Sequence, residues 1–347
     1  MLLIIYNLKI MKYIIVGGTG FVGSNLAWHF KTKGNEVIAI DNLSKTVGTF
    51  ENKARIESIG VKVINVDIRN WNDVEHFFKS QNDIGAIIHV AAQVAFSISV
   101  SNPRLDFEIN ALGTFNLLEA LRLYHPKAAF VNASTNQVYG QQEQVPLIEN
   151  EKRFDYKDLK FGLPETFPLD FLSPYGCSKG AADQYTLDYA RLYDLKTVSA
   201  RLGGIYGDWQ YSYEDHGWVA YMTQMVVRNK TFNRYGHGKQ VRDVLYISDI
   251  CNAFELIIKN AINIRGEAIN IAGGYSNTLS VLELLDLLES LTKNKEKSIM
   301  NPMRKADKLV AYLDIRKAKE LIGWEPLVSK EEGISKLINW TKKNLNN

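Results

Sequence analysis

The sequence is poor in the features that mark metal, disulfide-rich and nucleic-acid-binding proteins. Its 347 residues include only two cysteines, Cys177 and Cys251, too few and too far apart for a disulfide framework or a cysteine metal site. The six histidines lack metal-ligand spacing, so we expect no metal. Basic residues form no block and the formal net charge is only +3, which argues against a nucleic-acid partner. So few cysteines suit a reducing cytoplasm.

Long apolar runs are also missing. The stretch MLLIIYNLKI at 1–10 is too short to span a membrane, and it has neither the cationic leader nor the small-residue cleavage site of a signal peptide. We therefore expect no membrane partner. A second methionine, Met11, opens MKYIIVGG. Residues 1–10 are then either an upstream extension of a chain that starts at Met11, or an extra edge strand or loose tail.

What the sequence does contain is an alternation of strand and helix signals in its first half. Short apolar runs rich in β-branched residues indicate strands at 12–16, 36–40, 61–66, 86–90, 129–133 and 198–202. Strands as apolar as these are buried on both faces, which favours a parallel sheet between two layers of helices. The rhythm predicts right-handed crossovers and an α/β fold with a doubly wound parallel Rossmann sheet.

The pattern becomes less regular after about residue 202. Three helices are predicted there, the first and last with a serine–glutamate capping box, at 280–291, 315–322 and 330–345. We expect a Rossmann domain at 11–203, to which 242–260 returns. The remaining segments, 204–241 and 261–347, are expected to form a smaller C-terminal substrate-binding domain at the edge of the sheet where such folds bind ligands.

A glycine-rich turn follows the first strand and opens the first helix. Gly17, Gly20 and Gly23 have the spacing for a tight turn, a close approach of the backbone to a pyrophosphate, and close packing of the helix. The N–H groups and dipole of that helix favour phosphate. Asp41 ends the second strand, where a carboxylate accepts hydrogen bonds from the ribose hydroxyls and repels a 2′-phosphate. The sequence therefore predicts a site for NAD rather than NADP.

Later strand ends supply further expected cofactor contacts. Asp67 and Ile68 end the third strand and are expected at the adenine. Ala91 and Ala92 end the fourth strand, where small residues let the cofactor lie against the backbone. The other expected cofactor contacts come from the glycine turn, from loops at the same edge of the sheet and from the catalytic helix: Phe21, Val22, Asn42, Ser44, Gln93, Asn110, Tyr175 and Lys179.

A Tyr-x-x-x-Lys motif follows the fifth strand at some distance. Tyr175 and Lys179 are four residues apart, so on a helix they share a face. The lysine ammonium is then expected to lower the pKa of the phenol, which can take a proton from a sugar hydroxyl. Thr135, at the end of the fifth strand, is expected to hydrogen-bond the reacting oxygen, with Ser134 as the alternative hydroxyl.

The chain resembles the extended short-chain dehydrogenase/reductases, especially those with NAD epimerase/dehydratase activity, in five motifs: GGTGFVG (17–23), DNLS (41–44), DIRN (67–70), STNQVYG (134–140) and SPYGCSKGAADQY (173–185). The resemblance extends from about Met11 to the end of the chain. It implies tightly held NAD, a catalytic triad of Thr135, Tyr175 and Lys179, and a nucleotide-diphosphate-sugar substrate. It also implies a homodimer, for which the amphipathic helices near 105–124 and 178–193 offer a second apolar face.

Two departures from the family pattern narrow the expected reaction. Dehydratases of the family carry an Asp-Glu pair where this chain has Asn136-Gln137, and amides cannot serve as acids. Epimerases acting at C4 usually show Arg-Tyr-Phe-Asn where this chain has Arg-Leu-Gly-Gly at 201–204. These departures disfavour elimination and inversion at C4. The wording of the stretches 106–120, 134–140, 173–191, 213–219 and 238–249 resembles epimerases of the family that invert C2 of a CDP-sugar, and this reaction is what the resemblance implies. The alternatives are a UDP-sugar 4-epimerase, a nucleotide-sugar dehydratase or reductase, and a non-catalytic NAD-sensing regulator.

The resemblance also suggests which residues meet the substrate. Arg242 and Arg304 match family arginines near the diphosphate, although structural or surface salt bridges are the alternative for both. Gln93, Thr135 and Asn136 are placed by position near the sugar. We expect the segment 141–172 to border the sugar pocket as a lid.

Overall fold

A computed structural model of the chain describes residues 10–304 and 307–345. The expectation for the N-terminal stretch concerns residues 1–10, and nine of these lie outside the described residues. The largest element is a seven-stranded parallel sheet with the order β3-β2-β1-β4-β5-β8-β12. Its strands are β1 (Lys12–Val16), β2 (Glu36–Asp41), β3 (Lys62–Asn65), β4 (Ile84–His89), β5 (Ala129–Thr135), β8 (Lys196–Leu202) and β12 (Ala268–Ile271). The expected doubly wound Rossmann sheet is confirmed.

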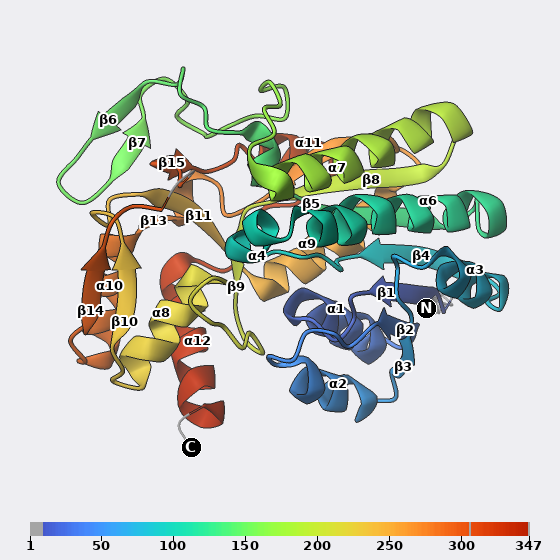
Figure 1. Cartoon of the computed structure of the whole chain (residues 1–347), viewed down its shortest axis with the longest axis horizontal. Helices are drawn as coiled ribbons and strands as arrows, with labels where there is room; N and C mark the ends of the chain where they lie inside the picture. Colours follow the sequence, from blue (N-terminus) through green and yellow to red (C-terminus); the bar gives the residue numbers. More distant parts are fainter. Residues whose placement is uncertain (1–9, 305–306, 346–347) are drawn as a thin grey trace, which may run out of the picture.

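Helices cover both faces of this sheet (Figure 1). The strands alternate between the two layers: in β1, Tyr13 and Ile15 belong to one apolar core, and Ile14 and Val16 to the other. This is why the strands read as continuous apolar runs. The first core includes α1 (Phe21–Thr32), α2 (Thr49–Glu57), α9 (Ile247–Asn260) and α11 (Arg316–Ile322), and the second includes α3 (Trp71–Lys79), α6 (Gly113–Tyr124) and α7 (Ser173–Tyr193).

The two long helices predicted from amphipathic spacing differ in detail from expectation. The first is built from consecutive pieces: α4 (Phe96–Ser101), α5 (Pro103–Phe107), a π-helical turn η1 (Glu108–Leu112) and α6. The second, α7, begins at Ser173 rather than at 178, with proline in its first turn, where a missing N–H costs nothing. Tyr175 therefore lies at the start of a long helix.

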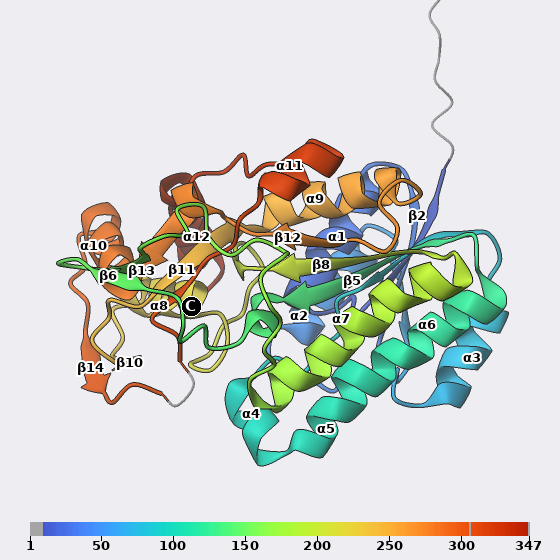
Figure 2. The same ribbon diagram turned by 90° about the horizontal axis from the view of Figure 1, so that it is seen from above.

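A smaller part lies at one side of the sheet, next to its carboxyl ends (Figure 2). It holds a mixed sheet of β9 (Gly204–Tyr206), β11 (Val241–Tyr246), β13 (Thr278–Ser280) and β15 (Val310–Ala311), the pair β10 (Phe232–Tyr235) and β14 (Ser298–Asn301), and the hairpin β6 (Leu147–Glu149) and β7 (Phe154–Tyr156). Its helices are α8 (Trp218–Val227), α10 (Val281–Thr292) and α12 (Lys330–Asn344), and short 3-10 turns occur at η2 (Asn136–Tyr139) and η3 (Tyr275–Asn277). The capping box at Ser280 is present in full.

Two strands differ from the expected division of the chain. β12 lies in a segment assigned to the smaller domain, yet it pairs with β8 and extends the main sheet. β11 lies in the segment 242–260, which was expected to return to the Rossmann part, yet it pairs with β9, β13 and β15. Only α9 of that segment returns, packing beside α1. The chain thus crosses between the two parts more often than its periodicity indicates.

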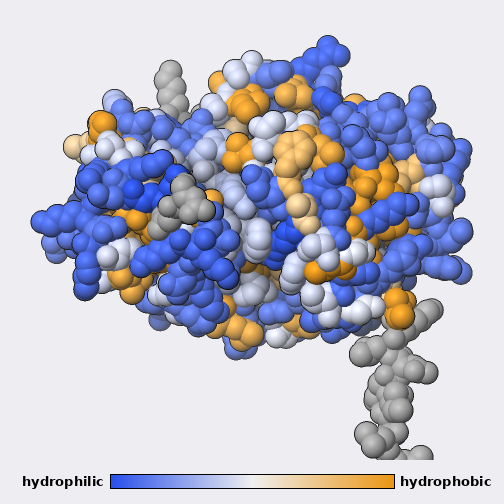
Figure 3. All heavy atoms as spheres, turned by 90° about the horizontal axis from the view of Figure 1, so that it is seen from below, coloured by the Kyte–Doolittle hydropathy of each residue, from blue (hydrophilic) through white to orange (hydrophobic). Residues whose placement is uncertain are grey.

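The surface carries no sign of a membrane span in the described residues. None of the described helices is long and apolar enough to cross a membrane. Hydrophilic residues cover most of the face seen from below, with hydrophobic ones in patches between them (Figure 3).

Candidate active site

A groove runs along the carboxyl ends of β1, β2, β3 and β4, and we call it the cofactor groove. Its volume is about 190 Å³. Most of the residues expected to contact the cofactor line it: Gly17, Gly20, Phe21, Val22, Gly23, Asp41, Asn42, Ser44, Asp67, Ile68, Ala91 and Ala92. Sequence analysis missed Lys45, Thr49 and His216 on the same wall. His216 comes from the smaller part of the chain, so no pattern near the glycine turn pointed to it.

The glycine turn is shaped for a close approach of the backbone. Gly17 has φ +82°, and a Cβ there would lie 2.6 Å from Cα of Ala91. A Cβ on Gly23 would lie 2.1 Å from the carbonyl oxygen of Gly17. Gly20 caps α1, and no described side chain hydrogen-bonds at this cap. The first N–H groups of α1 therefore reach the groove without a side-chain partner, an arrangement that binds phosphate and fits the pyrophosphate of NAD.

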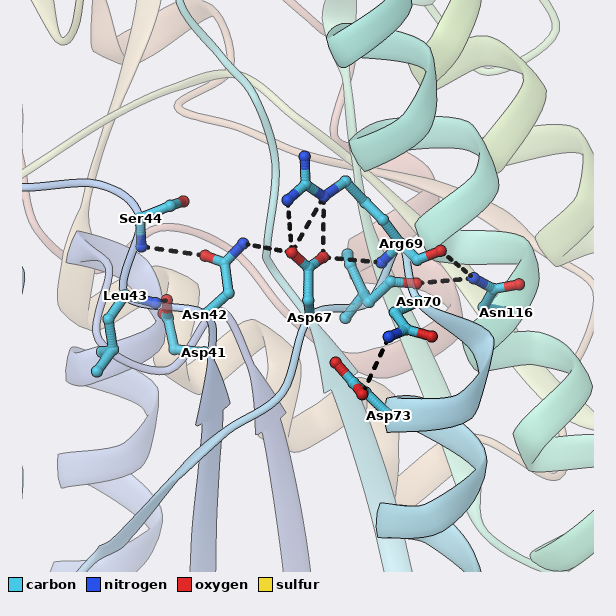
Figure 4. Close-up of polar contacts among 10 residues, drawn as sticks. Asp41, Asn42, Leu43, Ser44, Asp67, Arg69, Asn70, Asp73 and Asn116 are labelled. Carbon is cyan, nitrogen blue, oxygen red and sulfur yellow. Dashed lines mark hydrogen bonds and ion pairs between the residues drawn. The ribbon is translucent and has the colours of Figure 1, made fainter.

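The carboxylates of two residues, Asp41 at the end of β2 and Asp67 after β3, line the groove (Figure 4). Asp41 accepts hydrogen bonds from the backbone N–H of Thr19 at 3.1 Å and of Leu43 at 2.9 Å, which holds it at the end of β2. Asp67 is bound by the guanidinium of Arg69, with Nε–Oδ1 at 2.9 Å and Nη2–Oδ2 at 2.5 Å. These bonds lower the pKa of Asp67 to about 2. Asp67 lines the groove, but its oxygens are already engaged by Arg69.

Tyr175 is positioned by the start of α7. Its backbone N–H donates to Oγ of Ser99 at 2.9 Å, and its phenol lies near the hydroxyl of Thr135. Burial raises the pKa of Tyr175 to about 12, and Asp106 raises it further, whereas Thr135 opposes the rise. The lowering expected from Lys179 is therefore not found in the protein alone. A further positive charge, such as that of the nicotinamide ring of NAD, is needed to lower the pKa of Tyr175 below its ordinary value.

Lys179 lies one turn further along α7 and is only 2% exposed. Its Nζ donates to the carbonyl oxygen of Ala133 at 2.5 Å, which ties α7 to the end of β5. Burial lowers the pKa of Lys179 to about 8, and the negative charges of Asp183 and Asp106 oppose this. The structure thus brings Thr135, Tyr175 and Lys179 together at the carboxyl end of β5, as the motif spacing predicted.

A second cavity, of about 280 Å³, lies beside the cofactor groove, and we call it the substrate cavity. Tyr175 and Gln137 line it, as do Arg242 and Arg304 from the smaller part. Val94 lines both spaces, so the cavity and the groove adjoin at this residue. The phenol of Tyr175 therefore borders a space that reaches from the cofactor groove to two arginines.

The two arginines are each paired with an acid. Arg242 donates from Nη2 to Oδ1 of Asp307 at 2.5 Å. Arg304 pairs with Asp215 at 2.8 Å, and its guanidinium carbon lies 4.0 Å from the centre of the Tyr235 ring. The salt-bridge alternative considered from sequence is thus present in both cases. Arg242 also donates to two backbone carbonyl oxygens at 2.7 Å. A guanidinium has five N–H donors, so both arginines still have donors for a diphosphate.

Some expected contacts lie away from both spaces. The side chain of Gln93 folds onto its own loop, bonding the backbone of Ala95 at 2.7 and 2.9 Å. Asn110 holds the backbone of Gln93 and the hydroxyl of Ser178. The described residues that line the two spaces include neither of these, nor Asn136, Thr135 or Lys179. Gln93 and Asn110 therefore support the wall of the site.

Other cavity residues escaped sequence analysis because they come from separate elements. The stretches 213–219 and 238–249 contribute several of them. The missed residues are Gln137, Glu214, Trp218, Tyr221, Met222, Asn233, Tyr235, Gln240, Val281 and Asp307. Of the expected lid at 141–172, only Leu172 reaches the cavity wall. Within 10–304 and 307–345, no group of three or more His, Cys, Asp or Glu is placed to hold a metal ion.

A glycine-turn groove, an adjoining cavity lined by Tyr175 and two arginines, and a lysine one turn after that tyrosine define an enzyme of the short-chain dehydrogenase/reductase class. The family model described as GDP-mannose 4,6 dehydratase matches residues 14–337, and the chain belongs to this family. The resemblance to the extended short-chain dehydrogenase/reductases is thereby confirmed.

Relatives of known activity cover the chain almost completely. CDP-paratose 2-epimerase of Salmonella typhi is 44% identical over 95% of this chain and 99% of its own length. The crystal structure of Thermotoga maritima UDP-glucose 4-epimerase with UDP-glucose matches with a TM-score of 0.82 and 31% identity, covering 96% of this chain and 100% of that one. UDP-glucose 4-epimerase of Thermus thermophilus in complex with NAD has a TM-score of 0.81 and 29% identity, with 96% and 100% covered.

Proposed function

We propose that this protein is a cytoplasmic CDP-paratose 2-epimerase that holds NAD in the cofactor groove and converts CDP-paratose to CDP-tyvelose. The observation that carries the proposal is that Tyr175 and two arginines border one cavity, which adjoins the cofactor groove at Val94. The likeness to the Salmonella typhi enzyme along nearly the whole chain supports the choice of sugar and base. Two free cysteines, one exposed and one buried, suit a reducing compartment.

The residues of the cavity have separate tasks in this reaction. Arg242 and Arg304 hold the diphosphate, since a forked guanidinium matches phosphate oxygens. Tyr175 takes the proton of the C2 hydroxyl and returns it, and Thr135 hydrogen-bonds the same oxygen. Lys179 keeps a positive charge near the phenol and holds α7 on β5. NAD held in the cofactor groove would supply the acceptor and donor for reversible hydride transfer at the sugar carbon. The anchored diphosphate allows the sugar to turn between the two transfers.

The residues after Thr135 support epimerisation over dehydration. Elimination of a hydroxyl needs a side chain that can protonate the leaving oxygen. Gln137 lines the substrate cavity, at a position where the family's dehydratases have an acid, and Asn136 is not among the described residues of the cavity wall. An amide has no proton to give near neutral pH. Oxidation followed by hydride return is then the reaction that these residues can complete.

The test is to incubate the purified protein, without added cofactor, with CDP-paratose in deuterated water and to follow the sugar by NMR. The expected product is CDP-tyvelose without deuterium at C2, because the hydride never exchanges with solvent. The Tyr175→Phe variant is the matched control and should lose at least about 100-fold in turnover. Deuterium at C2 would replace hydride transfer by proton exchange. Turnover of a UDP-sugar at C4, with CDP-paratose inert, would overturn the proposal.

We also propose that the protein is a homodimer formed through α5, α6 and α7, with no nucleic-acid or membrane partner. These helices lie together in front of the sheet in Figure 2. They expose large apolar side chains that the core does not use: Phe107, Leu123, Tyr185, Leu192 and Tyr193. A second copy of the same face would remove them from water.

A further inference from the structure

One wall of the substrate cavity carries a fixed carboxylate to which the reaction above gives no task. Glu214 lines the cavity together with Asn233 and Tyr235, which lie two residues apart on β10. The amide nitrogen of Asn233 donates to both carboxylate oxygens at 3.1 Å, and the hydroxyl of Tyr235 donates to Oε1. Two donors from one strand therefore set the direction of this carboxylate before any ligand arrives.

The orientation of the Asn233 amide is itself determined. Asn301 on β14 donates from Nδ2 to the amide oxygen of Asn233 at 3.2 Å, so the amide nitrogen must face Glu214. A carboxylate offers about four acceptor positions. Oε2 of Glu214 receives one of these three bonds and Oε1 receives two. Glu214 thus retains the capacity to accept a hydrogen bond from a ligand.

The neighbouring residue links this carboxylate to an arginine assigned to the diphosphate. Asp215 pairs with Arg304, whose guanidinium stacks on the ring of Tyr235. Glu214, Tyr235 and Arg304 are therefore parts of one connected cluster. Tyr175 reaches the same cavity from α7, which packs on the main sheet. If the sugar lies at Tyr175 and the phosphates at the arginines, as in the proposed function, the base of the nucleotide is directed toward this cluster, which lines the same cavity.

We propose that Glu214 is the residue that selects a cytosine base. Cytosine presents an exocyclic amino group as a donor at C4, which a carboxylate accepts, whereas uracil and thymine present a carbonyl oxygen there. A charged acceptor facing a carbonyl oxygen loses its hydrogen bond and is repelled, which disfavours the wrong base by about 10- to 100-fold. The inference rests on the proposed function, because that function brings a CDP-sugar into the cavity.

The experiment measures binding of CDP and UDP to the NAD-loaded protein by calorimetry, so no turnover is required. The wild type should bind CDP about 10- to 100-fold more tightly than UDP. In Glu214→Gln the ratio should fall to within about threefold of unity, because an amide both accepts and donates. Glu149→Gln is the matched control and should keep the wild-type ratio. Glu149 lies on β6, and the change removes an exposed carboxylate that pairs with Lys239.

A second variant protects the test against loss of folding in Glu214→Gln. Tyr235→Phe removes one donor to Glu214 without changing charge, and it should lower the CDP-to-UDP ratio less than Glu214→Gln does. Equal affinity of the wild type for CDP and UDP would overturn the inference, as would an unchanged ratio in Glu214→Gln or, where that variant does not fold, in Tyr235→Phe. Tighter binding of a purine diphosphate than of CDP would also overturn it.

The two proposals can fail separately. If CDP-paratose is epimerised while Glu214→Gln keeps the preference for CDP, only the role of Glu214 is wrong. If CDP is preferred through Glu214 while CDP-paratose is not converted, the proposed function is wrong and the base selection stands.

Discussion

Asp183 and Arg201 form an ion pair in the interior, with 2.8 Å between Oδ2 and Nη2 and side chains that are 0% and 3% exposed. Asp183 lies on α7 one turn after Lys179, and Arg201 lies on β8. Ser199 donates to Asp183 at 2.6 Å, and Arg201 donates to the hydroxyl of Tyr139 at 3.1 Å. Both charges are thus hydrogen-bonded on several sides, and they join the catalytic helix to the sheet.

Removing one member of this pair should strongly destabilise the protein. Asp183→Asn leaves the guanidinium of Arg201 buried without a counter-charge, and breaking a buried pair in this way costs about 3–5 kcal/mol. Urea unfolding followed by circular dichroism measures the difference. Lys336→Ala is the control, since it breaks an exposed pair with Glu332 and should cost less than about 1 kcal/mol. Equal losses in the two variants would contradict the assigned role of burial.

Lys308 should make stability depend on pH. The side chain is 3% exposed, and its ammonium has no hydrogen-bond partner among the described residues. Burial, helped by Arg242, lowers the pKa of Lys308 from 10.5 to about 7, while Asp170 and Asp307 oppose the shift. In the unfolded chain the amine stays protonated up to pH 10.5. Burying the charged amine therefore lowers the free energy of unfolding by its full amount below pH 7, and this loss of stability decreases as the pH rises toward 10.5.

The corresponding test is Lys308→Met, which keeps an unbranched side chain of similar length and removes the charge. Its melting temperature should exceed that of the wild type at pH 7, and the gap should shrink at pH 10. Calorimetric scans of the ligand-free protein at the two values check this. Lys336→Met, at an exposed lysine, should show no such gap at either pH. A difference in melting temperature between Lys308→Met and the wild type that stays constant from pH 7 to pH 10 would show that the charge of Lys308 is not its cause.

Asp41 and Asp67 should differ in their effect on cofactor choice, although both are carboxylates in one groove. Asp41→Ser removes the charge that repels a 2′-phosphate, so the ratio of NAD to NADP affinity should fall by at least about tenfold. Asp67→Asn removes the same charge from a residue already neutralised by Arg69, and the ratio should stay within about threefold. Calorimetric titration of the cofactor-free protein gives both ratios. Equal effects would mean that Asp41 does not face the ribose.

The Rossmann sheet and the Tyr-x-x-x-Lys motif were predictable because their signals are local. A buried parallel strand is a continuous apolar run, and a Tyr-x-x-x-Lys spacing is read directly from one helix. β12 was missed because Ala268–Ile271 is only four residues long, too short for periodicity to separate strand from loop. Glu214 was missed because its partners, Asn233 and Tyr235, come from a different segment, and their proximity exists only after folding.

Side-chain direction was equally beyond the sequence. Gln93 lies where expected, at the end of β4, but its amide is satisfied by the backbone of Ala95 and not by a ligand. Tyr175 and Lys179 share a face as predicted, yet burial and not the lysine dominates the pKa of the phenol. Position along a strand or helix sets which residues are near the site. Competing hydrogen bonds and desolvation then decide what each one does there.

The exposed aromatic side chain of Tyr185 offers a test of the proposed dimer. It lies in the middle of α7, is 46% exposed and packs edge-on against Phe115 of α6, with ring centres 5.6 Å apart. If α6 and α7 of two copies meet, Tyr185→Glu brings a charge into an apolar contact and should convert dimers to monomers. Sedimentation velocity at micromolar concentration measures the change.

Tyr275→Glu provides the matched control for this substitution. Tyr275 is 50% exposed and lies near one aromatic ring, Tyr312, but it belongs to a short turn in the smaller part of the chain. The same change of residue type at the same exposure should therefore leave the sedimentation coefficient unaltered. A dimer that survives Tyr185→Glu, or one lost equally in Tyr275→Glu, would exclude the α6–α7 face as the interface.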